Sequence, residues 1–282
     1  MALFASNIIT SDSALGAAKI QRSLRFNPSD RTYLDKTFSS AGNRTTFTFS
    51  FWIKRTITGR NTFIFSPQVG GDGSNESRLY ITDGDQLRVY DSGGSSGYIV
   101  ARAAALLRDT GSWYHCIVAI DTTQSTDSDR AKFYINGVQQ DIDTSGYHQW
   151  GNQNQQLGWG NNNRHRIGSD GYQNSFSTGM IITDYLAEVH YIDGLQLDAS
   201  YFGFTEPQTG IWRPKKYTYG NYGTNGFYLN FSDNSATTAA TLGRDRSGNG
   251  NDFTPNNFSV AAGEGNDSSL DTPSNNFVTL TP

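Results

Sequence analysis

The sequence predicts an all-β protein, a sandwich of two antiparallel sheets of the jelly-roll kind with extended arms at both ends. Three observations lead to this prediction. Apolar residues alternate with period two in many segments. Turns rich in Gly, Asn and Asp separate these segments at short intervals. The composition favours strands and turns over helices, because 30 Gly, 17 Phe and 15 Tyr stand beside few Leu, Lys and Glu.

The clearest alternation lies in three segments of the first half of the chain. "TFTFSFWIKR" (46–55) places on one face Phe47, Phe49, Phe51 and Ile53. "SWYHCIVAID" (112–121) places on one face Tyr114, Cys116, Val118 and Ile120. "AKFYINGVQQ" (131–140) reads as two short strands joined at Asn136-Gly137, a pair that tolerates the positive φ angles of a tight hairpin turn. All three segments are therefore expected to be strands.

Two further hairpins are expected, turning at Asp83-Gly84 and at Asp193-Gly194. A later strand is expected in "GFYLNFSD" (226–233). "VARAAALLRD" (100–109) has the composition of a helix, but a strand fits it equally well. "DASYFG" (198–203) is short enough for a single helical turn. Helix is otherwise not expected.

The domain organisation is indicated by where these patterns stop. Residues 1–20 are a polar leader without strand periodicity, and we expect an extended N-terminal arm there. Residues 21–231 hold the strands and form the sandwich. Residues 232–282 contain few apolar anchors, so we expect an irregular C-terminal arm packed on the sandwich or on a neighbouring subunit.

Charge and hydropathy exclude several classes of function. The formal net charge is −4, and no basic run is longer than Lys215-Lys216, so no nucleic-acid partner is expected. No apolar stretch approaches the roughly 18 residues of a membrane span. The N-terminus has neither the basic nor the apolar region of a signal peptide. With Cys116 as the single cysteine, we expect synthesis in a reducing cytoplasm.

Residues 20–200 resemble the laminin-G-like and concanavalin-A-like jelly-roll modules. In those modules an early strand ends in Trp-x-Lys-Arg or a similar sequence, and a later Trp-x-His strand leads into a hairpin carrying Tyr-x-Asn-Gly. The matching residues here are Trp52, Lys54, Trp113, His115, Tyr134, Asn136 and Gly137. "LAEVHYIDG" (186–194) is similar to the closing strand of the same modules.

Residues 202–235, 242–259 and 271–277 resemble a block that recurs in virion proteins of marine tailed bacteriophages. This resemblance implies a structural component of a phage particle: a capsid fibre, a decoration protein or a tail-associated appendage. It further implies localisation to the virion after synthesis in the host cytoplasm. The implied partners are other virion proteins and further copies of the chain, with a trimer favoured, and the surface polysaccharide of the host is a further candidate partner.

A loop rich in Trp and Asn is the candidate glycan-binding site. Sugar sites combine an aromatic platform with amides and charged groups that hydrogen-bond the hydroxyls. The segment "HQWGNQNQQLGWGNNNRHR" (148–166) has this composition, and its candidate residues are Trp150, Trp159, Asn161, Asn162, Asn163 and Arg164. The alternative interpretation is that both tryptophans anchor a long loop to the sandwich while the amides satisfy turns. A lectin-like adhesion module is thus the alternative to a purely structural role.

The stretch "DRSGNGNDFTPNN" (245–257) begins like a helix-loop-helix calcium loop, but it ends differently. Position twelve is Asn256 where such loops place a bidentate Glu, and no flanking helices are expected. Asp245, Asn249 and Asp252 remain candidate calcium ligands in another geometry, and the alternative is a Gly-Asn turn whose side chains cap their own backbone. No other cofactor is expected.

Catalysis is not expected. Glycoside hydrolysis needs paired carboxylates roughly 5 to 9 Å apart. The nearest match, "AEVHYID" (187–193), places Glu188 on one face with His190 and Ile192, and Asp193 on the other. A glycoside hydrolase is the third function to consider, after the structural role and the lectin-like module. Cys116 lies in mid-strand, where a buried thiol is expected rather than a nucleophile.

Overall fold

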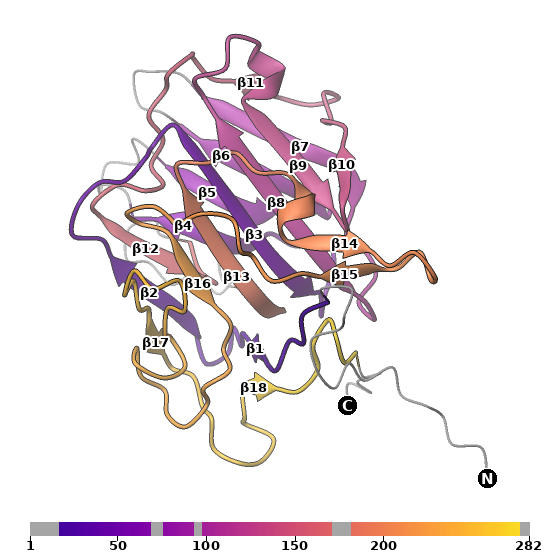
Figure 1. Ribbon diagram of the computed structural model, residues 1–282, viewed down its shortest axis with the longest axis vertical. Coiled ribbons are helices and arrows are strands. Elements are labelled where there is room, and N and C mark those ends of the chain that lie inside the picture. The colour runs from indigo at the N-terminus through magenta and orange to yellow at the C-terminus, as the bar shows by residue number, and fades with distance from the viewer. Residues whose placement is uncertain (1–16, 69–75, 93–97, 171–181, 277–282) are drawn as a thin grey trace.

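The computed structural model describes residues 17–68, 76–92, 98–170 and 182–276. Residues 1–16 of the expected N-terminal arm and 277–282 of the expected C-terminal arm lie outside the described residues. Two eight-stranded antiparallel sheets pack face to face, and the fold is all-β as predicted (Figure 1). No helix among the described residues is long and apolar enough to cross a membrane.

Sheet 1 has the strand order β10-β9-β8-β3-β13-β1-β18, and β16 pairs with β13 off this path. Its strands are β1 (Ser23–Arg25), β3 (Thr46–Lys54), β8 (Trp113–Asp121), β9 (Ala131–Ile135), β10 (Val138–Gln140), β13 (Tyr185–Asp193), β16 (Phe227–Leu229) and β18 (Ser268–Ser269). The three segments with the clearest alternation are β3, β8 and the β9–β10 hairpin, so these predictions are confirmed. Asn136 and Gly137 have φ angles of 48° and 83°, as a tight turn requires.

Sheet 2 has the strand order β11-β7-β6-β5-β4-β12-β2-β17. Its strands are β2 (Tyr33–Thr37), β4 (Thr62–Pro67), β5 (Ser77–Ile81), β6 (Gln86–Asp91), β7 (Ile99–Leu106), β11 (Gln149–Trp150), β12 (Arg164–Ile167) and β17 (Thr254–Asn256). The hairpin expected at Asp83-Gly84 joins β5 and β6. The ambiguous segment 100–109 falls largely in β7, because pairing with β6 and β11 outweighs its helical composition.

Three short elements complete the fold. β14 (Gly203–Thr205) and β15 (Trp212–Pro214) form a small hairpin that lies over sheet 1 (Figure 1). The 3-10 helices are η2 (Asp127–Asp129) and η5 (Ala199–Tyr201), and η5 is the single helical turn expected in 198–203.

The hairpin expected at Asp193-Gly194 does not form. β13 ends at Asp193, and its neighbours in sheet 1 are β3, β1 and β16 rather than a strand directly after the turn. After the end of β13 the chain instead leaves the sheet and crosses its outer face. The Thr48 hydroxyl anchors this crossing, since it donates to the Leu195 carbonyl and accepts from the Leu197 amide.

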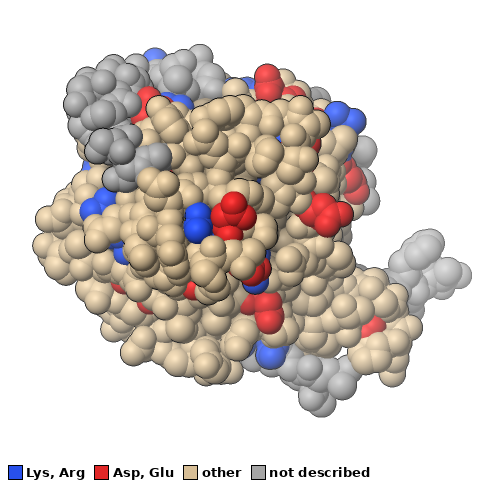
Figure 2. All heavy atoms as spheres, turned by 90° about the horizontal axis from the view of Figure 1, so that it is seen from above, with Lys and Arg blue, Asp and Glu red and all other residues tan. Residues whose placement is uncertain are grey.

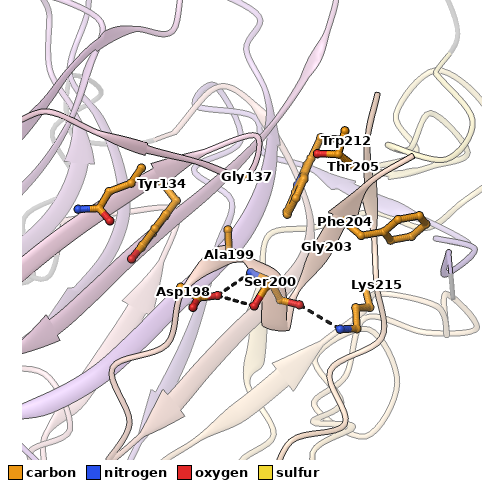
Figure 3. A pocket seen from close by; sticks show the side chains of 11 residues that line it. Tyr134, Gly137, Asp198, Ala199, Ser200, Gly203, Phe204, Thr205, Trp212 and Lys215 are labelled. Atoms are coloured by element: carbon orange, nitrogen blue, oxygen red, sulfur yellow. Dashed lines mark hydrogen bonds between the residues drawn. The ribbon is translucent and has the colours of Figure 1, made fainter. Parts of the chain in front are cut away.

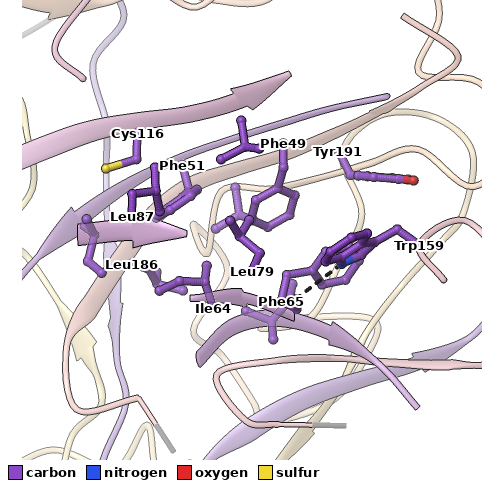
Figure 4. Packing of buried hydrophobic residues seen from close by; sticks show 14 of the residues in the cluster. Phe49, Phe51, Ile64, Phe65, Leu79, Leu87, Cys116, Trp159, Leu186 and Tyr191 are labelled. Atoms are coloured by element: carbon purple, nitrogen blue, oxygen red, sulfur yellow. Dashed lines mark hydrogen bonds between the residues drawn. The ribbon is translucent and has the colours of Figure 1, made fainter. Parts of the chain in front are cut away.

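The core between the sheets is aromatic. Phe49 and Phe65 stack face to face with ring centroids 4.8 Å apart, one ring from each sheet. Figure 4 shows neighbouring core side chains around them, including Cys116, Leu186 and Tyr191. Each such side chain contributes about 1.5 to 3 kcal/mol by leaving water, so the alternating faces of β3 and β8 fix the orientation of sheet 1.

The last two described strands each join a different sheet. β17 pairs with β2, and β18 pairs with β1, so the first two and the last two described strands lie side by side (Figure 1). Leu242, Phe253 and Phe258 enter the core between the sheets. Residues 232–276 therefore pack on the sandwich of their own chain and extend its two sheets.

Candidate functional site

The outer face of sheet 1 is covered by residues 195–228. Phe202, Tyr217 and Tyr222 from this segment pack on Ile117 and Ile192 of the sheet and form a second apolar cluster. A sandwich usually leaves the outer face of a sheet in water. Here that face is buried, and the covering segment builds a new surface above it.

His115 links the sheet to this covering segment. The indole Nε1–H of Trp212 donates to His115 Nδ1 over 3.0 Å. An indole N–H can only donate, so the imidazole proton lies on Nε2, which faces Ser50 Oγ at 2.9 Å. Burial lowers the pKa of His115 to about 3, and neighbouring His190 adds to this shift, so the ring is neutral near pH 7.

A pocket of about 580 Å³ opens where the covering segment meets the β9–β10 hairpin. We call it the tryptophan pocket, and its principal lining residues are Tyr134, Gln139, Asp198, Ser200, Trp212 and Lys215. Figure 3 shows Tyr134 and Trp212 on opposite sides, with Asp198, Ala199 and Ser200 between them. The pocket thus combines two aromatic rings with several polar groups.

Two glycines hold the Trp212 ring in place. A Cβ atom at Gly137 would lie 2.4 Å from Trp212 Cε3, and one at Gly203 would lie 2.3 Å from Cζ2. Both are closer than any real Cβ contact, so the ring fits only against bare backbone. Gly137 also has a φ of +83°, which disfavours any larger residue. The half-buried ring is therefore rigidly positioned at the pocket wall.

The polar groups of the tryptophan pocket are ordered by one another. Asp198 Oδ1 caps η5, accepting from the Ser200 amide at 2.8 Å and from the Ser200 hydroxyl at 2.6 Å. Lys215 Nζ donates to the Ser200 carbonyl at 3.0 Å. The side chains of Asp198, Ser200 and Lys215 are exposed. Such a set offers both donors and acceptors to the hydroxyls of a sugar.

Trp159 does not belong to a binding surface. Its ring is 1% exposed, lies in the core beside Phe47, and donates through Nε1 to the Phe65 carbonyl (Figure 4). The expectation that it presents a face to a glycan is wrong, because the sandwich has a space at this end that the indole fills. The alternative interpretation, a tryptophan that anchors its loop, describes Trp159 correctly.

Trp150 and the Asn-rich turn are far apart. Trp150 lies in β11, pairs with Ile99 and packs half-buried against the core. Arg164 begins β12, and four strands stand between β11 and β12 in sheet 2, which places them roughly 24 Å apart at about 4.8 Å per strand. The structure therefore does not bring the predicted glycan-binding residues together.

The predicted amides at 161–163 serve the turn itself. Asn161 Oδ1 accepts from the Asn162 amide, and Asn163 Nδ2 donates to the Gln68 carbonyl at 2.6 Å. Arg164 lies at the start of β12, and its guanidinium is 3.9 Å from the Asp35 carboxylate of the neighbouring strand β2. Of this group only Asn162 has an exposed side chain.

The three candidate calcium ligands form a closed hydrogen-bonded turn. The Asp245 carboxylate accepts from the amides of Tyr228, Ser247 and Asn251 and from the Ser247 hydroxyl. Asp252 Oδ1 accepts from the Asp245 amide, and Asn249 Nδ2 donates to the carbonyls of Gly223 and Gly226. Because Asn249 turns donors inward and the Asp245 oxygens are already occupied, this geometry contradicts a calcium loop here and matches the self-capping turn. Within the described part of the chain, no group of three His, Cys, Asp or Glu could hold a metal.

The sequence reasoning missed Trp212, Asp198 and Lys215. The sequence did contain one indication of this site. Residues 201–228 hold more aromatic side chains than a turn-rich surface segment needs. Charge gave no further guide. Figure 2 shows one face of the molecule, where acidic and basic side chains lie scattered among uncharged ones without an extended patch of one sign.

Comparisons with known proteins agree with the fold. The model of the concanavalin A-like lectin/glucanases superfamily matches residues 29–181, more than half of the chain. No curated protein matches in sequence. Among solved structures, a candidate carbohydrate-binding protein of Bacteroides ovatus has 17% identity and a TM-score of 0.50, covering 85% of this chain and 60% of that one.

Two further solved structures are similar with lower TM-scores. A heptameric SAP-like pentraxin of Limulus polyphemus has 16% identity and a TM-score of 0.44, covering 64% of this chain and 80% of that one. Domains LG4-5 of the mouse laminin alpha1 chain have 15% identity and a TM-score of 0.43, covering 78% and 50%. At such identities the likeness concerns the fold alone.

Proposed function

Because this chain belongs to the concanavalin A-like lectin/glucanases superfamily, we propose that it is a non-enzymatic carbohydrate-binding module whose ligand occupies the tryptophan pocket. One observation carries the proposal: a rigid, half-buried indole stands beside exposed hydrogen-bonding side chains in one pocket of about 580 Å³. The apolar face of a pyranose stacks on such a ring, while its hydroxyls need donors and acceptors at the edge.

Binding without cleavage fits the acid content of the pocket. Among the described residues that line it, Asp198 is the one carboxylate. Glycoside hydrolysis needs a second carboxyl group roughly 5 to 9 Å away, to act as nucleophile or base opposite the acid. The Asp198 carboxylate also accepts the hydrogen bond that caps η5. It therefore acts as a hydrogen-bond acceptor here, which is the role that a sugar hydroxyl requires.

A structural role in a phage virion is the second part of the proposal. It is supported by the resemblance of residues 202–235, 242–259 and 271–277 to blocks of tailed-phage virion proteins. In this chain those blocks supply Trp212 to the pocket, Asp245 to a turn that is hydrogen-bonded to β16, and Asp271 to the contact with Lys54 of β3. A module that is assembled on a particle, as a fibre or appendage with trimeric symmetry, would present its pocket to host-surface polysaccharide.

The carbohydrate proposal is tested on a glycan array with Trp212→Ala and Gln139→Ala. We expect the wild type to bind at least one oligosaccharide, and each variant to weaken that binding, Trp212→Ala by about tenfold or more. Gln139 is exposed, so its variant separates lost contacts from lost folding. Tyr147→Ala, an aromatic side chain that is 62% exposed and lies outside the pocket, is the matched control.

Two results would reject the proposal. One is the absence of binding to every glycan by a folded protein. The other is binding that Gln139→Ala and Trp212→Ala leave unchanged. The virion role is tested separately by cryo-electron microscopy of the particle and by the mass of the purified chain in solution, where a monomer would contradict the trimer.

A further inference from the structure

A second hollow surface lies beside the first described residues. Two adjoining cavities of about 460 and 390 Å³ share Lys19, Gln21 and Ser232. We call their combined surface the basic groove. It runs along residues 18–22, between β16 with its following loop on one side and residues 270–275 on the other. Two cavities that share a wall give an elongated rather than a round site.

The groove is separated from the tryptophan pocket by a single extended segment. Ala17 and Lys215 form an antiparallel bridge, and the Ala18 amide donates to the Pro214 carbonyl at 2.9 Å. Side chains alternate in direction along an extended chain. Lys215 therefore lines the tryptophan pocket while Lys216 lines the basic groove.

Positive charge is concentrated in this groove. Four cationic side chains line it, namely Lys19, Arg22, Lys216 and Arg246. Glu188 is the one carboxylate among its described lining residues. Such a local excess of cations stands out in a chain whose net charge is −4. It complements a ligand with repeated negative charges.

Glu188 occupies an unusual position at the base of the groove. It lies in a bulge of β13 with a φ of 48°, a left-handed conformation that costs a residue with a side chain roughly 1 kcal/mol or more. This bulge keeps Glu188 and His190 on the side of Tyr228: the Tyr228 hydroxyl donates to Glu188 Oε2 at 2.6 Å, and His190 Nε2 lies 4.0 Å from the same oxygen.

The charged and titratable groups around Glu188 determine the net charge of the groove at each pH. Lys19, Lys216 and Arg246 line the cavity with it, while Tyr228 and His190 pack against it. Tyr222 and Asp245 lie behind them. Burial raises the pKa of Glu188 to about 7 and lowers that of His190 to about 3, so near pH 6 both groups are neutral and the lysines and arginines dominate.

We propose that the basic groove binds an acidic polysaccharide through its carboxylate or sulfate groups. The cations meet the charges, and neutral donors and acceptors along the groove meet the sugar hydroxyls: Gln21, Asn230, Ser232, Asn234 and Asn275. The one aromatic side chain that lines it, among the described residues, is Tyr228, whose ring is stacked on His190. The groove thus lacks the row of aromatic platforms on which single-stranded nucleic acids stack.

This inference extends the proposed function to a second site and depends only on the chain being a carbohydrate binder, not on the tryptophan pocket. It is tested with polygalacturonate as the carboxylated probe and dextran sulfate as the sulfated probe. Neutral dextran and oligo(dT) are the comparison polymers. The full chain is used at pH 6 and pH 8 in about 150 mM salt, where weak long-range attraction is screened.

We expect binding to at least one acidic polysaccharide, weakened at least fivefold in the double variant Lys216→Gln, Arg246→Gln. The control Lys132→Gln removes one positive charge from a half-buried side chain of β9 that does not line the groove, and it should leave the binding unchanged. Binding should be tighter at pH 6 than at pH 8, and Glu188→Gln should abolish this difference because the groove then carries no ionisable carboxyl.

Three outcomes would overturn the inference: no binding to either acidic polymer, equal binding to oligo(dT), or binding that the double variant does not weaken. Failure of the tryptophan pocket as a glycan site looks different. In that case the glycan binding of the tryptophan pocket would be missing, whereas acidic binding sensitive to Lys216 and Arg246 could still be measured.

Discussion

Glu188 shows how a single residue can set the pH response of this protein. Its side chain is 16% exposed and has the Tyr228 hydroxyl as its hydrogen-bond donor. Burial raises its pKa to about 7, whereas in the unfolded chain it is near 4.5. Between these two pH values the folded protein holds a proton on Glu188 that the unfolded chain releases, so the contribution of Glu188 to stability falls as pH rises from 4.5 to 7.

Glu188→Gln removes this loss. Glutamine keeps an oxygen that can accept from Tyr228, so we expect the variant to be more stable than the wild type at pH 8, by up to roughly 3 kcal/mol, and equally stable near pH 4.5. Urea unfolding at the two pH values measures the difference. Glu206→Gln is the control, because hydrogen bonds from Thr209 and Arg213 lower the pKa of the partly exposed Glu206. A Glu188→Gln variant that gains nothing at pH 8 would contradict the assignment.

Trp159 and Trp212 show what local sequence can reveal at the scale of one residue. Trp159 is flanked by two glycines and Trp212 by an isoleucine and an arginine, and neither context reveals that Trp159 is buried in the core while Trp212 is half-exposed at a pocket. Distant segments decide this difference. Phe47 and Phe65 surround Trp159, while Gly137 and His115 hold Trp212. An aromatic platform is therefore recognisable by composition, but its exposure is not.

At the scale of elements, the end of β3 is joined to the C-terminal segment by a buried ion pair. Lys54 Nζ lies 2.6 Å from Asp271 Oδ2, and both side chains are 3% exposed. Asp271 Oδ1 also accepts from the indole of Trp113, and Lys54 donates to Asn276. The residues just after β18 are thereby tied to two strands at the centre of sheet 1.

Asp271→Ala leaves the Lys54 ammonium buried without its carboxylate and the Trp113 indole without its acceptor. We expect a loss of about 3 to 5 kcal/mol in the free energy of unfolding, measured in urea at pH 7. Asp129→Ala, which breaks the exposed pair with Lys132, should cost about 0.5 kcal/mol or less. Adding Lys54→Met to Asp271→Ala should recover part of the loss. If it does not, the unpaired charge is not the cause.

Elements were predictable where alternation and turn chemistry agree, as in β3, β8 and the β9–β10 hairpin. The prediction failed at Asp193-Gly194, because a turn-forming dipeptide does not specify the path of the chain after the turn, and the Thr48 hydroxyl captures the chain instead. The bulge at Glu188 was equally hidden, since its strained backbone is imposed by neighbouring strands rather than by residue type. Local rules predicted strands well and their connections less well.

At the scale of the whole molecule, the sandwich is thickened on one side. Sheet 1 packs on sheet 2 through one face and on residues 195–228 through the other, so side chains of both faces of β3 and β13 are buried. The family's fold was predictable from the sequence, but this third layer was not, because no periodic pattern marks an irregular segment as a cover. Both proposed binding surfaces depend on that layer.

The layered arrangement buries three histidines, and we expect it to make the protein acid-sensitive. Burial lowers the pKa of His115 and His190 to about 3 and that of His165 to about 4, against 6.5 in the unfolded chain. As pH falls below 6.5 the unfolded chain takes up three protons that the folded state refuses, while Glu188 offsets one. Stability should therefore fall by roughly 3 kcal/mol per pH unit between pH 6 and 4.5.

Urea unfolding at several pH values measures this pH dependence of stability. His165→Phe, which keeps a ring between Phe38 and Phe65, should reduce this slope by about one proton. A wild-type stability that is flat from pH 7 to 5 would mean that these histidines take up protons without unfolding, and their buried surroundings would then have to admit water.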